Sequence, residues 1–307
     1  MEIGPVFYDS SAQWMLNLVL ASMIFGLALD IHWQDFKRVI TMPKAVIAGL
    51  GAQFLLLPAL TCAFTLLVDL PPGIELGMML VASCPGGAIS NFVTHLSGGN
   101  TALSISLTAA ASATAVIMMP INFMFWSQFN EPAMAIMQAI DVDSEQLFKT
   151  LILVLAIPLA AGLLIRAKFE AAAKIMHKLL KNTSLLALIA FILIAVTKNH
   201  EAFLQHLWFL LLIVFVHNGM AFLIGYLSAR SANLEVRDQK AVTIEVGMQN
   251  ASLAIAIVFT QFDGQAGMAL ICAFWGTWHI VAGLAVALIF KQQKSEQPVS
   301  ISGNGRE

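Results

Sequence analysis

The chain has 307 residues, of which 59% are hydrophobic and only 11% are charged, and its mean hydropathy is +0.81. A soluble protein of this length cannot bury so much apolar surface, so the composition excludes a water-soluble globular protein and indicates one that lies in a lipid bilayer. The formal net charge of −2 and the lack of a basic cluster argue against a nucleic-acid partner.

Apolar segments follow one another along almost the whole chain. Windows of about 20 residues predict nine transmembrane helices, and helices rather than barrel strands because polar and apolar residues do not alternate. The predicted spans are 12–29, 43–68, 74–97, 101–125, 148–165, 182–197, 207–228, 240–260 and 267–290. The fold class is therefore an all-α polytopic membrane protein, with residues 1–290 as its transmembrane domain and 291–307 as a disordered cytoplasmic tail.

The basic residues divide unevenly between the two sets of connecting loops. Of the 16 Lys and Arg residues, all but Lys149 and Lys198 fall on one side of the nine predicted spans or in the C-terminal tail. The positive-inside rule then places the N-terminus outside and the C-terminus in the cytoplasm. We expect a multi-pass protein of the inner (plasma) membrane of the cell.

Two of the spans contain residues that weaken a helix. The third span has Pro-Gly-Gly at 85–87, followed by Ser-Asn at 90–91, and the eighth has Gly247, followed by Gln-Asn at 249–250. Interrupted hydrophobic segments at corresponding places in two halves are typical of a transporter binding site. Spans one to four match spans six to nine in order, and a step of five spans inverts the second copy. This pattern predicts an inverted repeat whose two discontinuous helices cross in the membrane.

Glu245 is the acidic residue that lies well inside a span, whereas the other 17 of the 18 lie in loops, in tails or near span ends. A charge at that depth costs about 2.5–3.5 kcal/mol and normally faces a partner or a cavity. No Lys or Arg lies at a comparable depth. Glu245 is therefore either protonated or neutralised by a cation that is not part of the chain.

The other deep polar side chains are also oxygen donors. Ser104 and Thr108 are four residues apart and hence share one helix face. Carboxylate, amide and hydroxyl oxygens suit a hard cation, and one carboxylate among neutral oxygens suits sodium better than calcium or magnesium. The remaining donors are Gln53, Ser90, Asn91, Gln249 and Asn250.

Several of these features also have a simpler explanation when each is taken alone. Ser104 and Thr108 alone would more often be helix-packing residues. Residues 85–87 alone could form a mere kink. His217 fits a packing histidine, and His279 is open between packing and facing a substrate cavity. The cysteines lie within spans at no metal-ligand spacing, which argues against zinc or copper.

Several segments of the sequence resemble motifs of a known protein family. The segments SCPGGAISN (83–91) and TIEVGMQNASLA (243–254) are similar to the two signature segments of the bile acid:sodium symporter family. That family includes the apical sodium-dependent bile acid transporter and the pantoate transporters. The motifs AQF, LSISLT, HNG and FWGTWH are also similar, and the resemblance extends over about residues 13–290. It implies a core domain of about 43–125 and 207–290 and a panel domain of about 12–29 and 148–197.

The resemblance also implies two sodium sites and a substrate site. Residues that match the first sodium site are Ser90, Asn91, Ser104, Thr108 and Glu245. Those that match the second are Gln53, Glu245, Gln249 and the main-chain carbonyls of Val246 and Met248. Asn91, Asn250 and His279 match substrate-binding positions. Ala88 and Ile280 depart from residues found in some members, which leaves the identity of the substrate open.

The implied function is a sodium-coupled secondary symporter that takes up an organic anion by alternating access, with two sodium ions per substrate. The anion would be a bile-acid-like or pantoate-like carboxylate, and no obligatory protein partner is implied. A proton-coupled carrier of the same fold is the alternative. An enzyme is not expected: an intramembrane hydrolase lacks support because the chain has no G-x-S-x-G motif, and His200-Glu201 is not followed by a second His at the H-E-x-x-H spacing.

Overall fold

The computed structural model describes residues 13–139, 144–180, 183, 186 and 207–295. Within these residues the secondary structure is helical, and the β structure is limited to one isolated bridge between Gly86 and Gln249. The helices are α1 (Gln13–Ala28), α2 (Trp33–Thr41), α3 (Pro43–Gly51), the π-helix η2 (Ala52–Leu56), α4 (Leu57–Leu67), α5 (Pro72–Ser83), α6 (Ile89–Leu96), α7 (Thr101–Ser127), α8 (Glu131–Ala139), α9 (Ser144–Lys168), α12 (Leu207–Ser231), α13 (Val236–Gly247), α14 (Ala251–Gln261) and α15 (Ala266–Ser295).

In the part of the chain that the structure describes, 5 helices are long and apolar enough to cross a membrane. They are Pro43–Leu67, Thr101–Ser127, Phe148–Lys168, Leu207–Ser231 and Ala266–Gln292, and they fall on predicted spans two, four, five, seven and nine. The first span appears as a shorter apolar helix, and the third and eighth are each divided in two. The sixth, 182–197, lies outside the described residues. The all-α class is thus confirmed for the described residues, and the count of nine spans stays a prediction.

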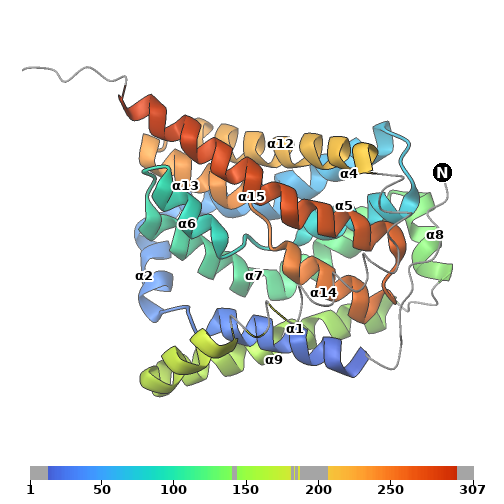
Figure 1. Cartoon of the computed structure of the whole chain (residues 1–307), viewed down its shortest axis with the longest axis horizontal. Coiled ribbons are helices and arrows are strands. Elements are labelled where there is room, and N and C mark those ends of the chain that lie inside the picture. Colours follow the sequence, from blue (N-terminus) through green and yellow to red (C-terminus); the bar gives the residue numbers. More distant parts are fainter. Residues whose placement is uncertain (1–12, 140–143, 181–182, 184–185, 187–206, 296–307) are drawn as a thin grey trace, which may run out of the picture.

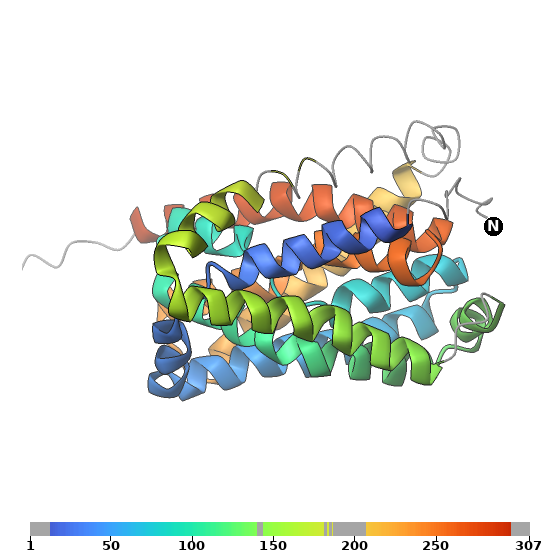
Figure 2. The same cartoon turned by 90° about the horizontal axis from the view of Figure 1, so that it is seen from below.

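The helices are arranged in two parts. In Figure 1, α1 and α9 lie side by side below the other labelled helices, and Figure 2 shows the same pair in front when the molecule is seen from below. The two parts touch where α1 packs on α14 and where α9 packs on α7. The contact of α1 with α14 lies beside the second interrupted helix. The division into panel and core domains stays a prediction.

Large apolar side chains fill the space between the remaining helices, those other than α1 and α9. Trp275, Phe123 and Phe262 are completely buried, and the rings of Phe123 and Phe262 meet edge to face with centroids 5.5 Å apart. These residues come from α15, α7 and the end of α14, so the core lies between helices that also carry the predicted site residues. Close packing of this kind holds neighbouring helices at fixed positions.

Short helices that the sequence reading did not predict lie between the spans. They are α2, α8 and the helical residues 170–180. The last span also continues as a helix to Ser295, five residues into the segment expected to be a disordered tail, and the rest of that tail lies outside the described residues.

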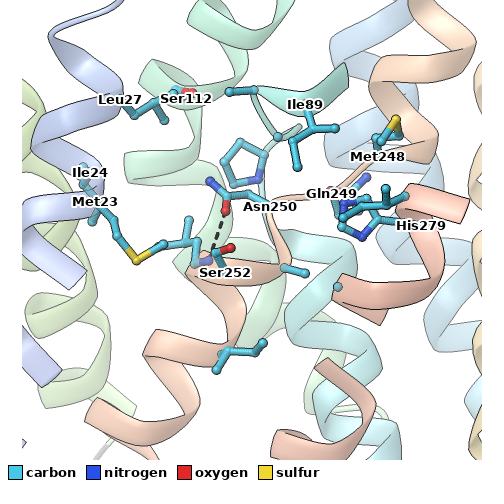
Figure 3. Close-up of a pocket in the computed structure, with 18 of the residues that line it drawn as sticks. Met23, Ile24, Leu27, Ile89, Ser112, Met248, Gln249, Asn250, Ser252 and His279 are labelled. Carbon is cyan, nitrogen blue, oxygen red and sulfur yellow. Dashed lines mark hydrogen bonds between the residues drawn. The ribbon is translucent and has the colours of Figure 1, made fainter. Parts of the chain in front are cut away.

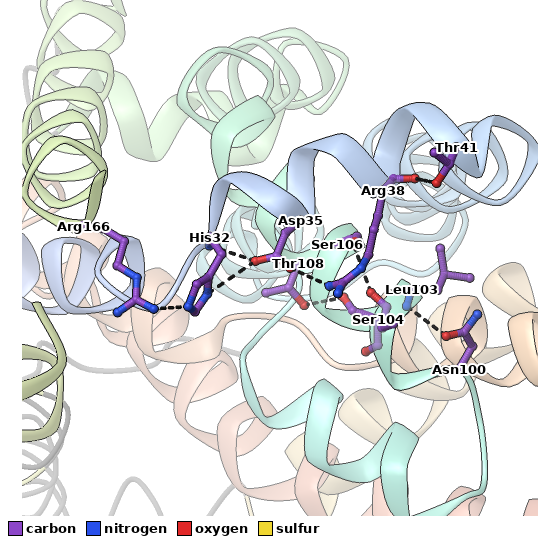
Figure 4. Close-up of polar contacts among 11 residues, drawn as sticks. His32, Asp35, Arg38, Thr41, Asn100, Leu103, Ser104, Ser106, Thr108 and Arg166 are labelled. Atoms are coloured by element: carbon purple, nitrogen blue, oxygen red, sulfur yellow. Dashed lines mark hydrogen bonds and ion pairs between the residues drawn. The ribbon is translucent and has the colours of Figure 1, made fainter. Parts of the chain in front are cut away.

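A polar network ties α9 to the connection between α1 and α2 (Figure 4). The Arg166 guanidinium contacts Nε2 of His32, and the His32 backbone N–H donates to Asp35 Oδ2 at 2.8 Å. Arg38 in turn donates to Asp35 Oδ1 at 3.0 Å. Asp35 is 3% exposed and Arg166 is 9% exposed, so the network satisfies two charged groups that the fold largely buries.

The two interruptions lie against each other. The first separates α5 from α6, and the second separates α13 from α14. The Gly87 N–H donates to the Met248 carbonyl at 2.8 Å, and the Asn250 N–H donates to the Pro85 carbonyl at 2.9 Å. Backbone groups that a break frees cannot be left to lipid, so each interruption supplies the hydrogen-bond partners that the other needs.

A different irregularity occurs within the Pro43–Leu67 segment. Five residues near its middle form the π-helix η2, which ends immediately before Leu57 and Pro58. Pro58 has no N–H, so the Phe54 carbonyl loses the partner that an α-helix would give it four residues later. The side-chain amide of Asn122 in α7 donates to that carbonyl at 2.8 Å instead. Gln53 lies in the same π-helix and is 1% exposed.

Candidate ion and substrate site

Glu245 lies in the last turn of α13 and is 3% exposed. Ser90 Oγ, from the first turn of α6, donates to its Oε2 atom at 2.6 Å. Thr108 Oγ1, from α7, lies 2.8 Å from Oε1 and 3.0 Å from Oε2. The carboxylate therefore meets hydroxyl groups from two other helices, and in the described part of the chain no ion pair joins it to a basic side chain.

Asn91 extends this cluster. Its Oδ1 atom accepts from Ser104 Oγ at 2.8 Å and lies 3.2 Å from Thr108 Oγ1. Because Thr108 has a single hydroxyl proton, its oxygen can donate to one of these acceptors at a time. The predicted first site thus gathers in one place, with oxygens from a carboxylate, an amide and three hydroxyl groups.

The second predicted set also comes together. Gln53 and Gln249 form a reciprocal amide pair: Gln53 Nε2 donates to Gln249 Oε1 at 2.7 Å, and Gln249 Nε2 donates to Gln53 Oε1 at 3.2 Å. Gln53 Nε2 also reaches the Cys84 carbonyl, and Gln249 Nε2 reaches the Val246 carbonyl, each at 2.7 Å. The pair joins η2 to the second interruption and lies next to the carbonyl oxygens freed at the end of α13.

Glycine at position 86 lets Glu245 approach the first interruption. A Cβ atom at Gly86 would overlap Oε1 of Glu245 and would lie 2.8 Å from its Cδ atom. A side chain of any kind here would displace the carboxylate or the backbone. The requirement for glycine therefore belongs to the ion-site cluster as well as to the break in the helix.

A cavity of about 800 Å³ adjoins the interruptions. Its lining is mostly apolar and comes from both parts of the molecule, including α1, α9, α14 and α15. Figure 3 shows Met23, Ile24 and Leu27 of α1 on one side, His279 on the other and Asn250 between them. A few polar groups in a mostly apolar cavity are typical of a site for a small organic ligand.

Asn250 is the N-cap of α14, and its Oδ1 accepts from the Leu253 N–H at 3.0 Å. The cap leaves its Nδ2 group as a donor at the start of a helix, where the exposed N–H groups and the helix dipole favour an anion. His279 is 6% exposed and lines the cavity, with Nδ1 bonded to the Trp275 carbonyl at 2.7 Å. Asn250 and His279, two of the three predicted substrate residues, therefore line the same cavity.

Asn91, the third predicted substrate residue, lies with the hydroxyl groups of α7 and not among the described residues that line the cavity. The Met248 carbonyl, predicted as an ion ligand, is already bonded to the Gly87 N–H. His217 is completely buried between Thr61 Oγ1, at 2.8 Å, and the Trp275 ring. It thus occupies a packed position, as its simpler explanation predicted.

Three buried polar residues were not predicted from the sequence, two of them beside the site and the third, Glu75, at the far end of α5. Ser112 lines the cavity and donates to the Thr108 carbonyl at 2.7 Å, and its position four residues after Thr108 is a signal that could have found it. Asn218 is completely buried and donates to the Gly247 carbonyl at 2.7 Å. Glu75, near a span end, is as buried as Glu245 but bonds to Asn130 and to the Leu70 N–H.

Comparison with known proteins identifies the family. A model of the sodium bile acid symporter family matches residues 17–206. An uncharacterized sodium-dependent transporter of Bacillus subtilis (strain 168), YocS, is 31% identical over 302 residues, which cover 97% of this chain and 90% of that protein. A probable sodium/metabolite cotransporter of Arabidopsis thaliana, the chloroplastic BASS1, is 29% identical over 285 residues, which cover 93% of this chain and 68% of that protein. These relatives are named as transporters and not as enzymes. The chain therefore belongs to the sodium bile acid symporter family, a family of sodium-dependent multi-pass membrane transporters.

Proposed function

We propose that the protein is a symporter that couples the uptake of an organic anion to two sodium ions. The observation that carries the proposal is the environment of Glu245. Its carboxylate lies among oxygen donors from α6 and α7, with Ser90 Oγ at 2.6 Å and Thr108 Oγ1 at 2.8 Å. A buried charge without a basic partner needs a cation, and a cage of carboxylate, hydroxyl and amide oxygens suits a hard monovalent one.

The first ion would be bound by this cage of Ser90, Asn91, Ser104, Thr108 and Glu245. The second would lie by the Gln53–Gln249 pair, with Glu245 and the carbonyls of Val246 and Met248 as further ligands. The amide pair and the Val246 carbonyl already lie within hydrogen-bond distance of one another. On binding an ion, the amide oxygens would turn toward it in place of their present hydrogen bonds. Glu245 is shared, so its substitution should weaken both sites.

The substrate would bind in the cavity between α1 with α9 and the remaining helices. Asn250 and the start of α14 would bind its anionic group, His279 would donate or accept a hydrogen bond, and the apolar lining would contact its body. Movement of the panel (about 12–29 and 148–197) against the core (about 43–125 and 207–290) would expose the cavity to each side in turn. The N-terminus would lie outside the plasma membrane and the C-terminus in the cytoplasm.

The test is uptake by the purified protein in proteoliposomes, measured with a panel of labelled organic anions, including a bile acid and pantoate, with and without a sodium gradient. Glu245→Gln should abolish sodium-driven uptake because it removes the charge that both ions neutralise. The matched control is Glu75→Gln, since Glu75 is equally buried but bonds to Asn130 and the Leu70 N–H. The control should keep its sodium dependence.

Sodium-dependent uptake by Glu245→Gln at the level of the parent protein would rule out the proposed ion sites. Uptake driven by a proton gradient without sodium would favour the proton-coupled alternative, in which Glu245 titrates alone. The cage argues for sodium because a proton needs one acceptor and not a set of converging oxygens.

A further inference from the structure

At the second interruption, the carbonyls of Val246, Gly247 and Met248 lack the partners that a continuous helix would give them. The Gly247 carbonyl is bonded to a side chain from another helix. In a continuous helix the Gly247 carbonyl would accept from the N–H of residue 251, but here the Ala251 N–H donates to the Gln249 carbonyl at 2.9 Å. The Gly247 carbonyl instead accepts from Asn218 Nδ2, in α12, at 2.7 Å. Asn218 is completely buried, so this bond is made away from water and lipid.

The same face of α12 also sets the position of the end of α13. Phe222, one turn after Asn218, leaves no room for a side chain at 247, because a Cβ atom there would overlap its ring. Further along α12, a Cβ atom at Gly225 would lie 3.0 Å from the Cα atom of Thr243 and 3.1 Å from the Val242 carbonyl oxygen. Successive turns of α12 thus fit closely against α13 and fix its distance and register.

The Gly247 peptide lies between the two main-chain groups proposed as ligands, Val246 and Met248. A peptide group is planar, so a bond that holds the Gly247 carbonyl also fixes the plane that joins Gly247 to Met248. The neighbouring carbonyls then have less freedom to turn. Asn218 acts on this peptide through its donor alone: its Oδ1 atom is buried and has no hydrogen-bond partner among the described residues.

We propose that Asn218 is a positioning residue for the second sodium site. It holds the Gly247 carbonyl away from the ion and thereby directs the carbonyls of Val246 and Met248 toward it. The inference rests on the proposed function, because it requires that second site. Groups that orient metal ligands typically affect metal affinity by about 10–100-fold when they are removed.

Asn122 offers a matched control. It is 5% exposed and its amide also donates to a freed carbonyl, that of Phe54, at 2.8 Å. The Phe54 carbonyl is not a proposed ligand, since the neighbouring Gln53 would bind the ion through its side chain. Loss of either asparagine removes one buried amide-to-carbonyl bond, but only Asn218 is bonded to the peptide between two proposed ligands.

The experiment is thermal unfolding of the full-length protein in detergent, titrated with sodium at constant ionic strength and without substrate. An ion that binds the native state raises the melting temperature, so the titration reports sodium affinity. In Asn218→Leu we expect the half-maximal sodium concentration to rise about tenfold and the Hill coefficient to fall toward one. In Asn122→Leu we expect a change below about twofold, even if both variants melt at a lower temperature without sodium.

Asn218→Ala serves if the leucine variant does not fold, because it also removes the amide donor and adds neither a charge nor a branched side chain at the buried position. A repeat with lithium adds a readout of geometry: misdirected carbonyls should change the ratio of the lithium and sodium half-points, which a general loss of stability would not. Equal shifts in the two asparagine variants would overturn the inference, and so would an unchanged curve for Asn218→Leu.

Gln53→Leu separates this inference from the proposed function. If Gln53→Leu weakens sodium binding and Asn218→Leu does not, the second site stands and the role of Asn218 is wrong. If Gln53→Leu also leaves the titration unchanged, the second site itself is absent, and both the proposed function and this inference fail.

Discussion

Replacing Thr108 by valine tests the first ion site with a small change of shape. The hydroxyl lies 2.8 Å and 3.0 Å from the two oxygens of Glu245, and the residue is 4% exposed. A hydrogen bond to a charged group contributes about 1.5–3 kcal/mol. The substitution removes the hydroxyl from the ion-free site as well as from the ion-bound site. Only the difference between these two effects changes the free energy of sodium binding, and we expect it to lie near the lower end of that range. Since about 1.4 kcal/mol corresponds to a factor of ten, we expect about a tenfold weaker first site.

The assay is anion uptake into proteoliposomes against sodium concentration at constant ionic strength. Thr108→Val should raise the half-saturating sodium concentration and reduce the Hill coefficient, because one of the two sites weakens. Ser106→Ala is the control: Ser106 is buried in the same helix, but its hydroxyl donates to the Ala102 carbonyl at 2.9 Å. If Thr108→Val behaved like Ser106→Ala, the hydroxyl would be a packing group and the reasoning for the first site would be refuted.

Two further predictions concern the carboxylate itself. Gly86→Ala should destabilise the protein by about 1–3 kcal/mol, the usual effect of overpacking, and should weaken sodium binding because its Cβ would overlap Oε1 of Glu245. Thermal unfolding with and without sodium measures both effects. If sodium raised the melting temperature as much as in the parent protein, the close approach of Gly86 to Glu245 would be contradicted. With Glu245 ionised, two sodium ions and a monoanion make the loaded site neutral, so each cycle should carry one positive charge inward. An inside-negative potential should then accelerate uptake, because moving one charge through the full field changes the free energy by about 2.3 kcal/mol per 100 mV. Voltage-independent uptake would argue against two ions per monoanion.

Much of the site could be predicted because membrane solvation makes polar residues conspicuous. In a chain with 11% charged residues, a carboxylate within an apolar span is costly and therefore indicates a functional site, and amides and hydroxyls at a similar depth indicate its partners. The family prediction is confirmed by the match over residues 17–206. The ligand sets and the number of ions stay predictions, although Glu245, Ser90 and Thr108 do lie together.

Other features could not be predicted because they depend on contacts between residues that are far apart in the sequence. Asn218 looks like any amide in an apolar helix, and its partner is a carbonyl 29 residues away. The Phe54 carbonyl in the π-helix is bonded to the side chain of Asn122, which lies 68 residues further along the chain. Burial of Glu75 likewise depends on Asn130, from a distant part of the chain. In each case a side chain satisfies a group on a different helix, and sequence periodicity does not show which helices will be neighbours.

The bilayer environment, the helical class and the places where two helices break could all be predicted from the residues alone. Those properties follow from local chemistry: apolar length sets a span, and proline and glycine weaken a helix wherever it lies. The structure adds that the two breaks pair through Gly87 and Asn250, that α7 brings Thr108 to Glu245, and that a cavity lies beside them. These arrangements depend on how separate helices pack, and the energy of that packing is shared by residues far apart in the chain.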